Sequence, residues 1–243
     1  MNTRSSESEA GHGPEGQYGA YHIGELVTKT IRHGLSLDPK CALYVQDKLE
    51  YALIEGLHEL YNSRSREHLD HILDVARMID EYFLQGWLTC VQRHPSPQRT
   101  RLSYLRIAIR DGNENCENSR SSFRVEMRDD DIGSLPIVDI DIDSAGRWTI
   151  TQTIEMLIHE MVHGYLLLFS CRGGFSQEFG GCGWHSLERR GRHGHFVRML
   201  MRHIFDTIQE WNDVLGCFGE DFIGRCNQED QGDALISMRN LFL

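Results

Sequence analysis

The sequence predicts a single α+β domain, in which helices precede a small sheet and further helices follow it. Three features support this fold class. Apolar residues recur at helical spacing in residues 38–84, short apolar or alternating stretches occupy residues 88–142, and helical spacing returns after residue 149. The chain of 243 residues is long enough to bury one sizeable core.

Two amphipathic helices are predicted before the sheet. Asp38 is a good N-cap and Pro39 a favourable first helical residue, and the apolar pattern then continues to about Tyr61. A second helical pattern runs from about residue 66 to residue 84 and stops at Gly86. We expect residues 1–19 to be a disordered tail, residues 20–65 an N-terminal helical extension, residues 66–210 the main domain and residues 211–243 a C-terminal extension.

The middle of the chain predicts a small antiparallel or mixed sheet, with antiparallel pairs in the majority. Its candidate strands are residues 88–91, 102–109, 123–127 and 137–142. After the sheet, Thr149 or Thr151 caps a helix that runs through Phe169. A further helix is expected over residues 194–209, and a weak one near residues 234–242.

Composition excludes several classes of protein. Hydrophobic residues make up 40% and charged residues 25% of the chain, which is typical of folded globular domains. The longest apolar run, Met161 to Phe169, is shorter than the roughly 18 residues that cross a bilayer. We therefore expect no membrane partner. Residues 1–17 lack the apolar core of a secretory signal, and the 7 cysteines contain no CxxC pair. Both features favour an intracellular protein of the nucleus or cytoplasm with reduced thiols.

The most informative motif is His159-Glu160-Met161-Val162-His163, an HExxH pattern inside a strongly apolar helix. Residues four apart share one helix face, so both imidazoles can reach one zinc ion with Glu160 beside them as general base. Burying these three polar groups is costly without a partner, which favours a metal over chance. The metzincin pattern is excluded, because Leu166 and Phe169 stand where that class needs Gly and His.

A catalytic zinc usually has a third protein ligand and one open position. The residues themselves leave this ligand open. Glu178 and Glu188 are weak candidates, because neither lies on a recognisable second helix. His193 and His195 stand at the start of the helix that follows, from which a side chain can reach the metal if that helix packs on the first.

The order of these elements resembles the SprT-like family of zinc metallopeptidases, which includes the Spartan proteases of DNA–protein crosslink repair. The resemblance covers roughly residues 79–208. It rests on a helix ending in Tyr82-Phe83-Leu84-Gln85-Gly86, a last strand at residues 137–142, the HExxH helix, and the pair His193-Gly194 before an apolar helix. Only HExxH is specific by itself, and the order of the elements supplies the rest.

The resemblance implies a zincin-like SprT domain that hydrolyses peptide bonds of protein substrates, including proteins associated with DNA. His159 and His163 match the first two zinc ligands, and Glu160 matches the general acid/base. The third ligand is the His of an HG pair, which His193 matches. His195 is the weaker alternative, because it lacks a following Gly.

DNA as a partner has mixed support in the sequence. The net charge of −11 repels polyanions, yet arginines cluster in residues 93–110 and 187–203. Residues 211–243 are acidic and contain only Cys217 and Cys226, so the zinc ribbon or basic tail of many DNA-directed relatives is missing from this stretch.

Two alternatives remain open at this point. One is a SprT-like protein- or DNA-binding module with little or no proteolytic turnover, which would have no need of Glu160. The other is a structural zinc site closed by a fourth ligand such as His185 or Cys182, which would leave no position for water.

Overall fold

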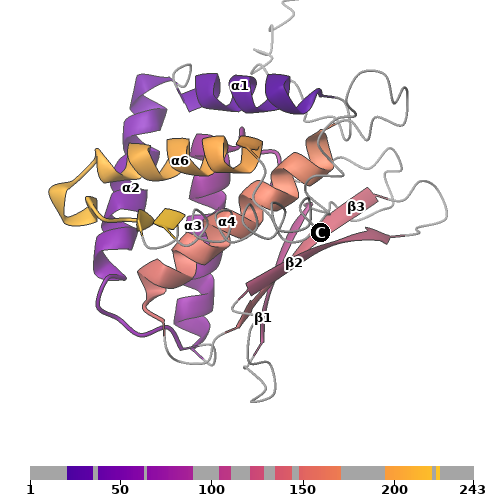
Figure 1. Cartoon of the computed structure of the whole chain (residues 1–243). Coiled ribbons are helices and arrows are strands. Elements are labelled where there is room, and N and C mark those ends of the chain that lie inside the picture. The colour runs from indigo at the N-terminus through magenta and orange to yellow at the C-terminus, as the bar shows by residue number, and fades with distance from the viewer. Residues whose placement is uncertain are drawn as a thin grey trace, which may run out of the picture.

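The computed structural model describes residues 21–34, 38–62, 65–89, 104–110, 121–128, 135–143, 148–170, 195–220 and 223–224. Its helices are α1 (Ile23–Gly34), α2 (Pro39–Glu55), α3 (Arg66–Phe83), α4 (Ile150–Phe169), α6 (His195–Gln209) and the short 3-10 helix η2 (Asp213–Leu215). Its strands are β1 (Leu105–Arg110), β2 (Ser121–Arg128) and β3 (Leu135–Asp143). Helix α4 crosses the middle of the molecule, with the sheet on one side and the other helices on the other (Figure 1). The fold class is α+β, as the sequence predicts.

The sheet is mixed, which is one of the two predicted arrangements, but antiparallel pairs are not in the majority among the described strands. The strand order is β1-β3-β2; β3 pairs in parallel with β1 and antiparallel with β2. Apolar alternation defines the buried face of a strand but not its direction, so this pairing had no local signal. The strand predicted at residues 88–91 is also wrong in its described part, because Leu88 lies in the turn after α3.

Helix α4 packs closely on the central strand. Val138 and Ile140 of β3 are fully buried. A Cβ atom on Gly164 of α4 would lie 2.7 Å from Cγ1 of Val138, closer than real Cβ contacts come. Glycine at this position therefore allows the helix to approach the sheet at the residue next to His163.

The N-terminus of α4 is fully capped, and the cap is Thr149 rather than Thr151. The Thr149 hydroxyl accepts a hydrogen bond from the Gln152 amide, and the Gln152 side chain accepts one from the Thr149 amide, which forms a capping box. The Thr151 hydroxyl instead donates to the carbonyl of Leu53 in α2, at 2.8 Å.

The linker between α2 and α3 supplies the remaining acceptors for this helix end. The Ile150 amide donates to the Glu59 carbonyl at 2.8 Å, and the Thr151 amide donates to the Gly56 carbonyl at 3.2 Å. Helix α2 consequently ends at Glu55. The apolar periodicity predicted an end at about Tyr61, which is wrong. The chain turns at Gly56, where a Cβ atom would lie 2.9 Å from the Ile150 side chain.

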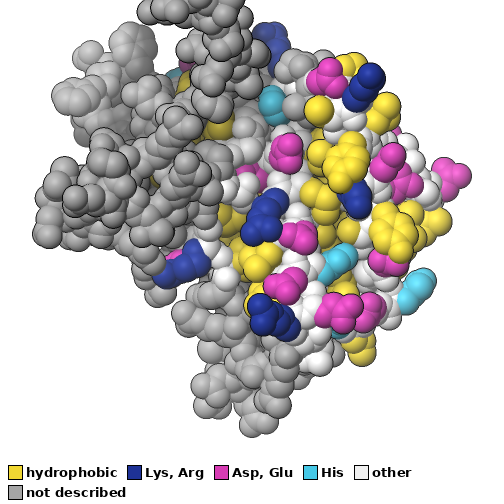
Figure 2. All heavy atoms as spheres, turned by 180° about the vertical axis from the view of Figure 1, so that it is seen from behind, with side chains coloured by type: hydrophobic (Ala, Val, Ile, Leu, Met, Phe, Trp, Pro, Cys, Tyr) yellow, Lys and Arg dark blue, Asp and Glu magenta, His cyan; other side chains and the backbone are white. Residues whose placement is uncertain are grey.

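The outer surfaces of α2 and α3 form much of the face seen in Figure 2, where acidic, basic and apolar side chains alternate. Two ion pairs lie on the surface of α3: Arg66 pairs with Asp70 at 3.7 Å, and Arg77 pairs with Asp74 at 2.8 Å. Such exposed pairs contribute little to stability. Helix α3 has the extent that the sequence predicts, with Ser65 as its N-cap.

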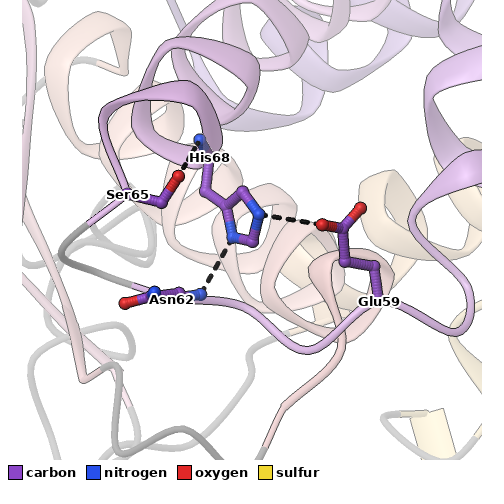
Figure 3. A network of polar contacts seen from close by, with 4 residues as sticks. All are labelled: Glu59, Asn62, Ser65 and His68. Carbon is purple, nitrogen blue, oxygen red and sulfur yellow. Dashed lines mark hydrogen bonds and ion pairs between the residues drawn. The ribbon is translucent and has the colours of Figure 1, made fainter.

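A histidine holds the linker in place (Figure 3). Nδ1 of His68 accepts a hydrogen bond from the Asn62 amide at 2.9 Å, and Nε2 lies 3.0 Å from the Glu59 carboxylate. The Ser65 hydroxyl accepts from the His68 amide at the start of α3. Because Glu59 also caps α4 through its carbonyl, this network connects α3 to the start of the HExxH helix.

One hydrophobic core joins all the described helices to the sheet. Helix α1, whose position the sequence did not predict, contributes Leu26 and Val27, while α2 contributes Leu49 and Leu53. The core therefore contains residues from both sides of the predicted boundary between residues 65 and 66. The division of the chain into an N-terminal extension and a main domain remains a prediction. None of the described helices is both long and apolar enough to cross a membrane.

Candidate metal centre

The two histidines of the HExxH motif converge on one point. Nε2 of His159 and Nε2 of His163 lie 2.7 Å apart, on adjacent turns of α4. The His159 side chain is 12% exposed, and His163 as a residue is 8% exposed. Two imidazoles on one nearly buried helix face, with their ring nitrogens close together, could supply two of the four ligands of a tetrahedral metal ion.

The donors fit a zinc ion. Zinc binds histidine nitrogens at about 2.0–2.1 Å, which puts two ligands of a tetrahedral ion roughly 3.3 Å apart. The observed separation of 2.7 Å suits a hydrogen bond between the two rings. It would have to widen by roughly 0.6 Å on metal binding. A small rotation of each ring about its side-chain bonds is enough for this change.

Glu160 lies beside the first histidine. Its carboxylate Oε1 is 3.6 Å from Nδ1 of His159, and its side chain is only 6% exposed. The distance is too long for a hydrogen bond but short enough for strong electrostatic interaction in a dry site. A carboxylate at this distance would favour a positively charged metal held by the ring.

The described residues do not complete the ligand set. Within the ranges given above, no group of three or more His, Cys, Asp or Glu side chains could hold a metal. His195 begins α6, is exposed, and packs its ring 5.6 Å from that of Phe196. Outside the described residues lie His193, Glu178, Glu188, Cys182 and His185. The assignment of His193 as third ligand therefore stays a prediction.

A buried hydrogen-bond network holds α4 just beyond the motif. The hydroxyl of Tyr165, two residues after His163, lies 2.9 Å from Oγ1 of Thr30 in α1 and accepts from Nε2 of Gln85 at 2.7 Å. Burial raises the pKa of Tyr165, so the phenol is neutral. Gln85 adopts a left-handed backbone with φ of 66° to reach it. The sequence alone does not reveal this network, because a tyrosine in an apolar run looks like ordinary packing.

The turn that positions Gln85 is organised by Asp80. This carboxylate is fully buried and accepts hydrogen bonds from the Leu88 amide, the Thr89 amide and the Thr89 hydroxyl, at 3.2, 2.6 and 2.7 Å. Burial raises the pKa of Asp80 to about 7, although these donors favour the charged form. Asp80 thus links α3 through the turn and Gln85 to the HExxH helix.

The segment after α6 is attached to α4 one turn before the motif. The Gly219 amide donates to Oε1 of Glu155 at 2.9 Å. Gly219 has a φ of 77°, and a Cβ atom there would lie 2.5 Å from the Phe205 ring. A residue with a side chain could not occupy this turn, so Glu155 and glycine together hold the segment against the helix.

The arginine clusters gain little support as a DNA surface. Most of their arginines lie outside the described residues. Arg106 makes a two-point ion pair with Asp139, which is its direct neighbour on β3 and is 2% exposed. A paired guanidinium offers less charge to a phosphate.

No protein-family model, no curated protein and no solved structure matches this chain.

Proposed function

We propose that this protein is a zinc-dependent metalloendopeptidase that hydrolyses peptide bonds of protein substrates. A single observation carries the proposal: two imidazole nitrogens converge at 2.7 Å beside a buried carboxylate, on one helix. The resemblance of the sequence to SprT-like metallopeptidases supports it, and so does the close packing of the HExxH helix on the sheet. A pure binding module would not need Glu160 in this dry position.

Each residue then has a distinct role. His159 and His163, with His193 as the third donor, would hold the zinc. The bound ion would supply Lewis acidity that polarises the scissile carbonyl and acidifies water. Glu160 takes a proton from the attacking water as the new C–O bond forms. It then gives that proton to the leaving amine as the C–N bond breaks.

The surroundings of the motif make these roles feasible. The capping box at Thr149 and the packing of Gly164 on Val138 hold both ends of the motif helix. Burial excludes bulk water from around Glu160 while leaving the one reacting water to the proposed zinc, and the low dielectric strengthens electrostatic interactions in the site. We further propose an intracellular location in the nucleus or cytoplasm. Cys41 and Cys217, both exposed and free, agree with a reducing compartment.

The deciding experiment measures zinc content and protease activity in the Glu160→Gln variant. We expect about one zinc per chain, because the ligands are untouched. We also expect a loss of at least ~100-fold in rate, because general acid–base catalysis contributes about 10²–10⁴-fold.

Glu155→Gln is the matched control, since Glu155 lies one turn earlier on α4 and its amide oxygen can still accept from Gly219. This variant should keep both zinc and activity. Full activity of Glu160→Gln, or a wild-type protein that never binds zinc, would overturn the proposed function.

A further inference from the structure

The outward side of α2 carries large apolar side chains that the fold leaves uncovered. Leu43, Tyr44 and Tyr51 are 57%, 65% and 63% exposed. The opposite side of the helix is buried in the core through Val45, Leu49, Ala52 and Leu53. A surface helix normally presents polar residues outward, so this second apolar stripe needs an explanation. We call residues Leu43, Tyr44, Asp47, Lys48, Tyr51 and Glu55 the outer face of α2.

A further exposed apolar side chain lies on η2. Nδ2 of Asn212 donates to Oε1 of Glu50 at 2.8 Å, which attaches η2 to α2. Val214 of η2 is 61% exposed. The side of the molecule formed by α2, at the right of Figure 2, accordingly shows apolar side chains set among acidic and basic ones. Aromatic anchors surrounded by charges are typical of protein interfaces.

The charged side chains of the outer face can pair with those of a second copy. Lys48 and Glu55 are seven residues apart and therefore lie on the same flank of the helix. Tyr51 lies halfway between them. If a second α2 packs antiparallel with its two-fold axis beside Tyr51, Lys48 of each copy faces Glu55 of the other. In a parallel two-fold pair each flank would instead face the opposite flank of its partner, so Lys48 would not meet Glu55.

Contacts within the helix already hold these side chains in position. Nζ of Lys48 lies 5.8 Å from the centre of the Tyr44 ring, and the Tyr51 hydroxyl donates to Oε1 of Glu55. Partly ordered side chains lose less entropy when a partner arrives. The outer face is thus prepared for association.

We propose that the outer face of α2 is a homodimer interface, in which two copies of this chain pair their α2 helices antiparallel. Leu43, Tyr44 and Tyr51 expose about three fifths of their surfaces, so in two copies they supply roughly 700 Å², which places the interface among the small, weak ones. The net charge of −11 per chain adds repulsion between copies. The dimer should therefore be weak and concentration-dependent. This inference does not rest on the proposed function.

Sedimentation velocity of the full chain, from low micromolar to millimolar concentration, tests the interface. Wild type should shift from monomer to dimer across this range, and Tyr51→Ala should remain monomeric. Met199→Ala is the matched control, because Met199 on α6 is also exposed, at 39%, but lies off the outer face of α2. It should dimerise like wild type. Circular dichroism melting checks that each variant is folded.

A charge exchange tests the antiparallel orientation. Lys48→Glu and Glu55→Lys should each weaken dimerisation about tenfold or more, because each creates two like-charge pairs. Mixing the two variants in equal amounts should restore dimers, since each copy then complements the other. Glu55→Lys also changes the net charge from −11 to −9, because a basic residue replaces an acidic one. Repulsion between whole molecules would therefore predict stronger association for this variant, opposite to our expectation.

Three outcomes would overturn the proposal. The first is a wild-type protein that stays monomeric at every concentration, whether its outer face is free or covered by another part of the chain. The second is a pair of single charge variants that dimerise as well as wild type. The third is a mixture that associates no better than either variant alone.

Discussion

In the proposed site, His159 and His163 would supply two of the ligands that zinc needs, and the third would come from another element of the chain. Two imidazoles on one helix face are a local property, because their spacing of four residues equals about one turn. The identity of the third donor depends on how the start of α6 meets α4. His195, at that start, is exposed. His193 lies outside the described residues, and its assignment as third ligand, with His195 as the weaker alternative, stays a prediction.

Substitution of the two candidates should separate them. We expect His193→Ala to lower zinc retention far more than His195→Ala, because loss of a ligand leaves only two protein donors. Zinc content after dialysis against a chelator, measured by elemental analysis, checks this expectation. The opposite order would assign the third position to His195.

At the scale of elements, the contact between α4 and β3 decides where the motif lies. Gly164 follows His163 directly, and its missing side chain allows Val138 to pack against the helix backbone. Glycine inside a helix costs about 1 kcal/mol relative to alanine, so this position sacrifices helix propensity for close packing. The end of α4 that precedes the motif is similarly fixed by the linker carbonyls of Gly56 and Glu59.

Gly164→Ala tests the importance of this contact. The new Cβ atom would meet Cγ1 of Val138 at 2.7 Å, and overpacking of this kind costs about 1–3 kcal/mol. We expect a net loss of stability in urea denaturation together with weaker zinc binding, because His163 is adjacent. Gly24→Ala in α1 is the control: its Cβ atom would lie 3.4 Å from Phe196, an ordinary contact. Equal stability of the two variants would show that the close approach is unimportant.

At the scale of the whole molecule, buried ionisable groups connect stability to pH. Asp80 in α3 has a folded-state pKa of about 7 against an unfolded value of 3.8. A pKa raised by folding means that the folded state holds the proton more tightly. Its contribution is fully present below pH 3.8 and is lost as pH rises towards 7. His33 and His203 act in the opposite direction. Burial lowers the pKa of both imidazoles, so their contribution to stability is lost as pH falls and they must be protonated.

The difference in unfolding free energy between wild type and Asp80→Asn isolates the first contribution. The variant cannot titrate at this position. As pH rises from 4 to 7, wild type should therefore lose stability relative to the variant, by on the order of a few kcal/mol. Urea denaturation at a series of pH values provides the measurement. A difference that does not change with pH would show that Asp80 is ionised in the folded protein throughout.

The helices and the motif could be predicted from the sequence because their signals are local. The Asp38 and Thr149 caps, the apolar spacing of α3, and the HExxH pattern each lie within a few turns of chain. The direction of β1 against β3 had no such signal, because alternation is the same for either direction. Helix α1 lay in a stretch that was predicted only as part of a helical extension.

By itself the sequence determined that this chain places two histidines and a glutamate on one apolar helix, since helical spacing depends only on neighbouring residues. Only the tertiary structure decided how that helix is held. Gly56 ends α2 so that the linker can cap α4, Gln85 reaches Tyr165 from another turn, and Val138 fills the space above Gly164. These contacts join residues far apart in the chain. They exist because buried polar groups and close-packed surfaces must be satisfied by whatever the fold brings near them.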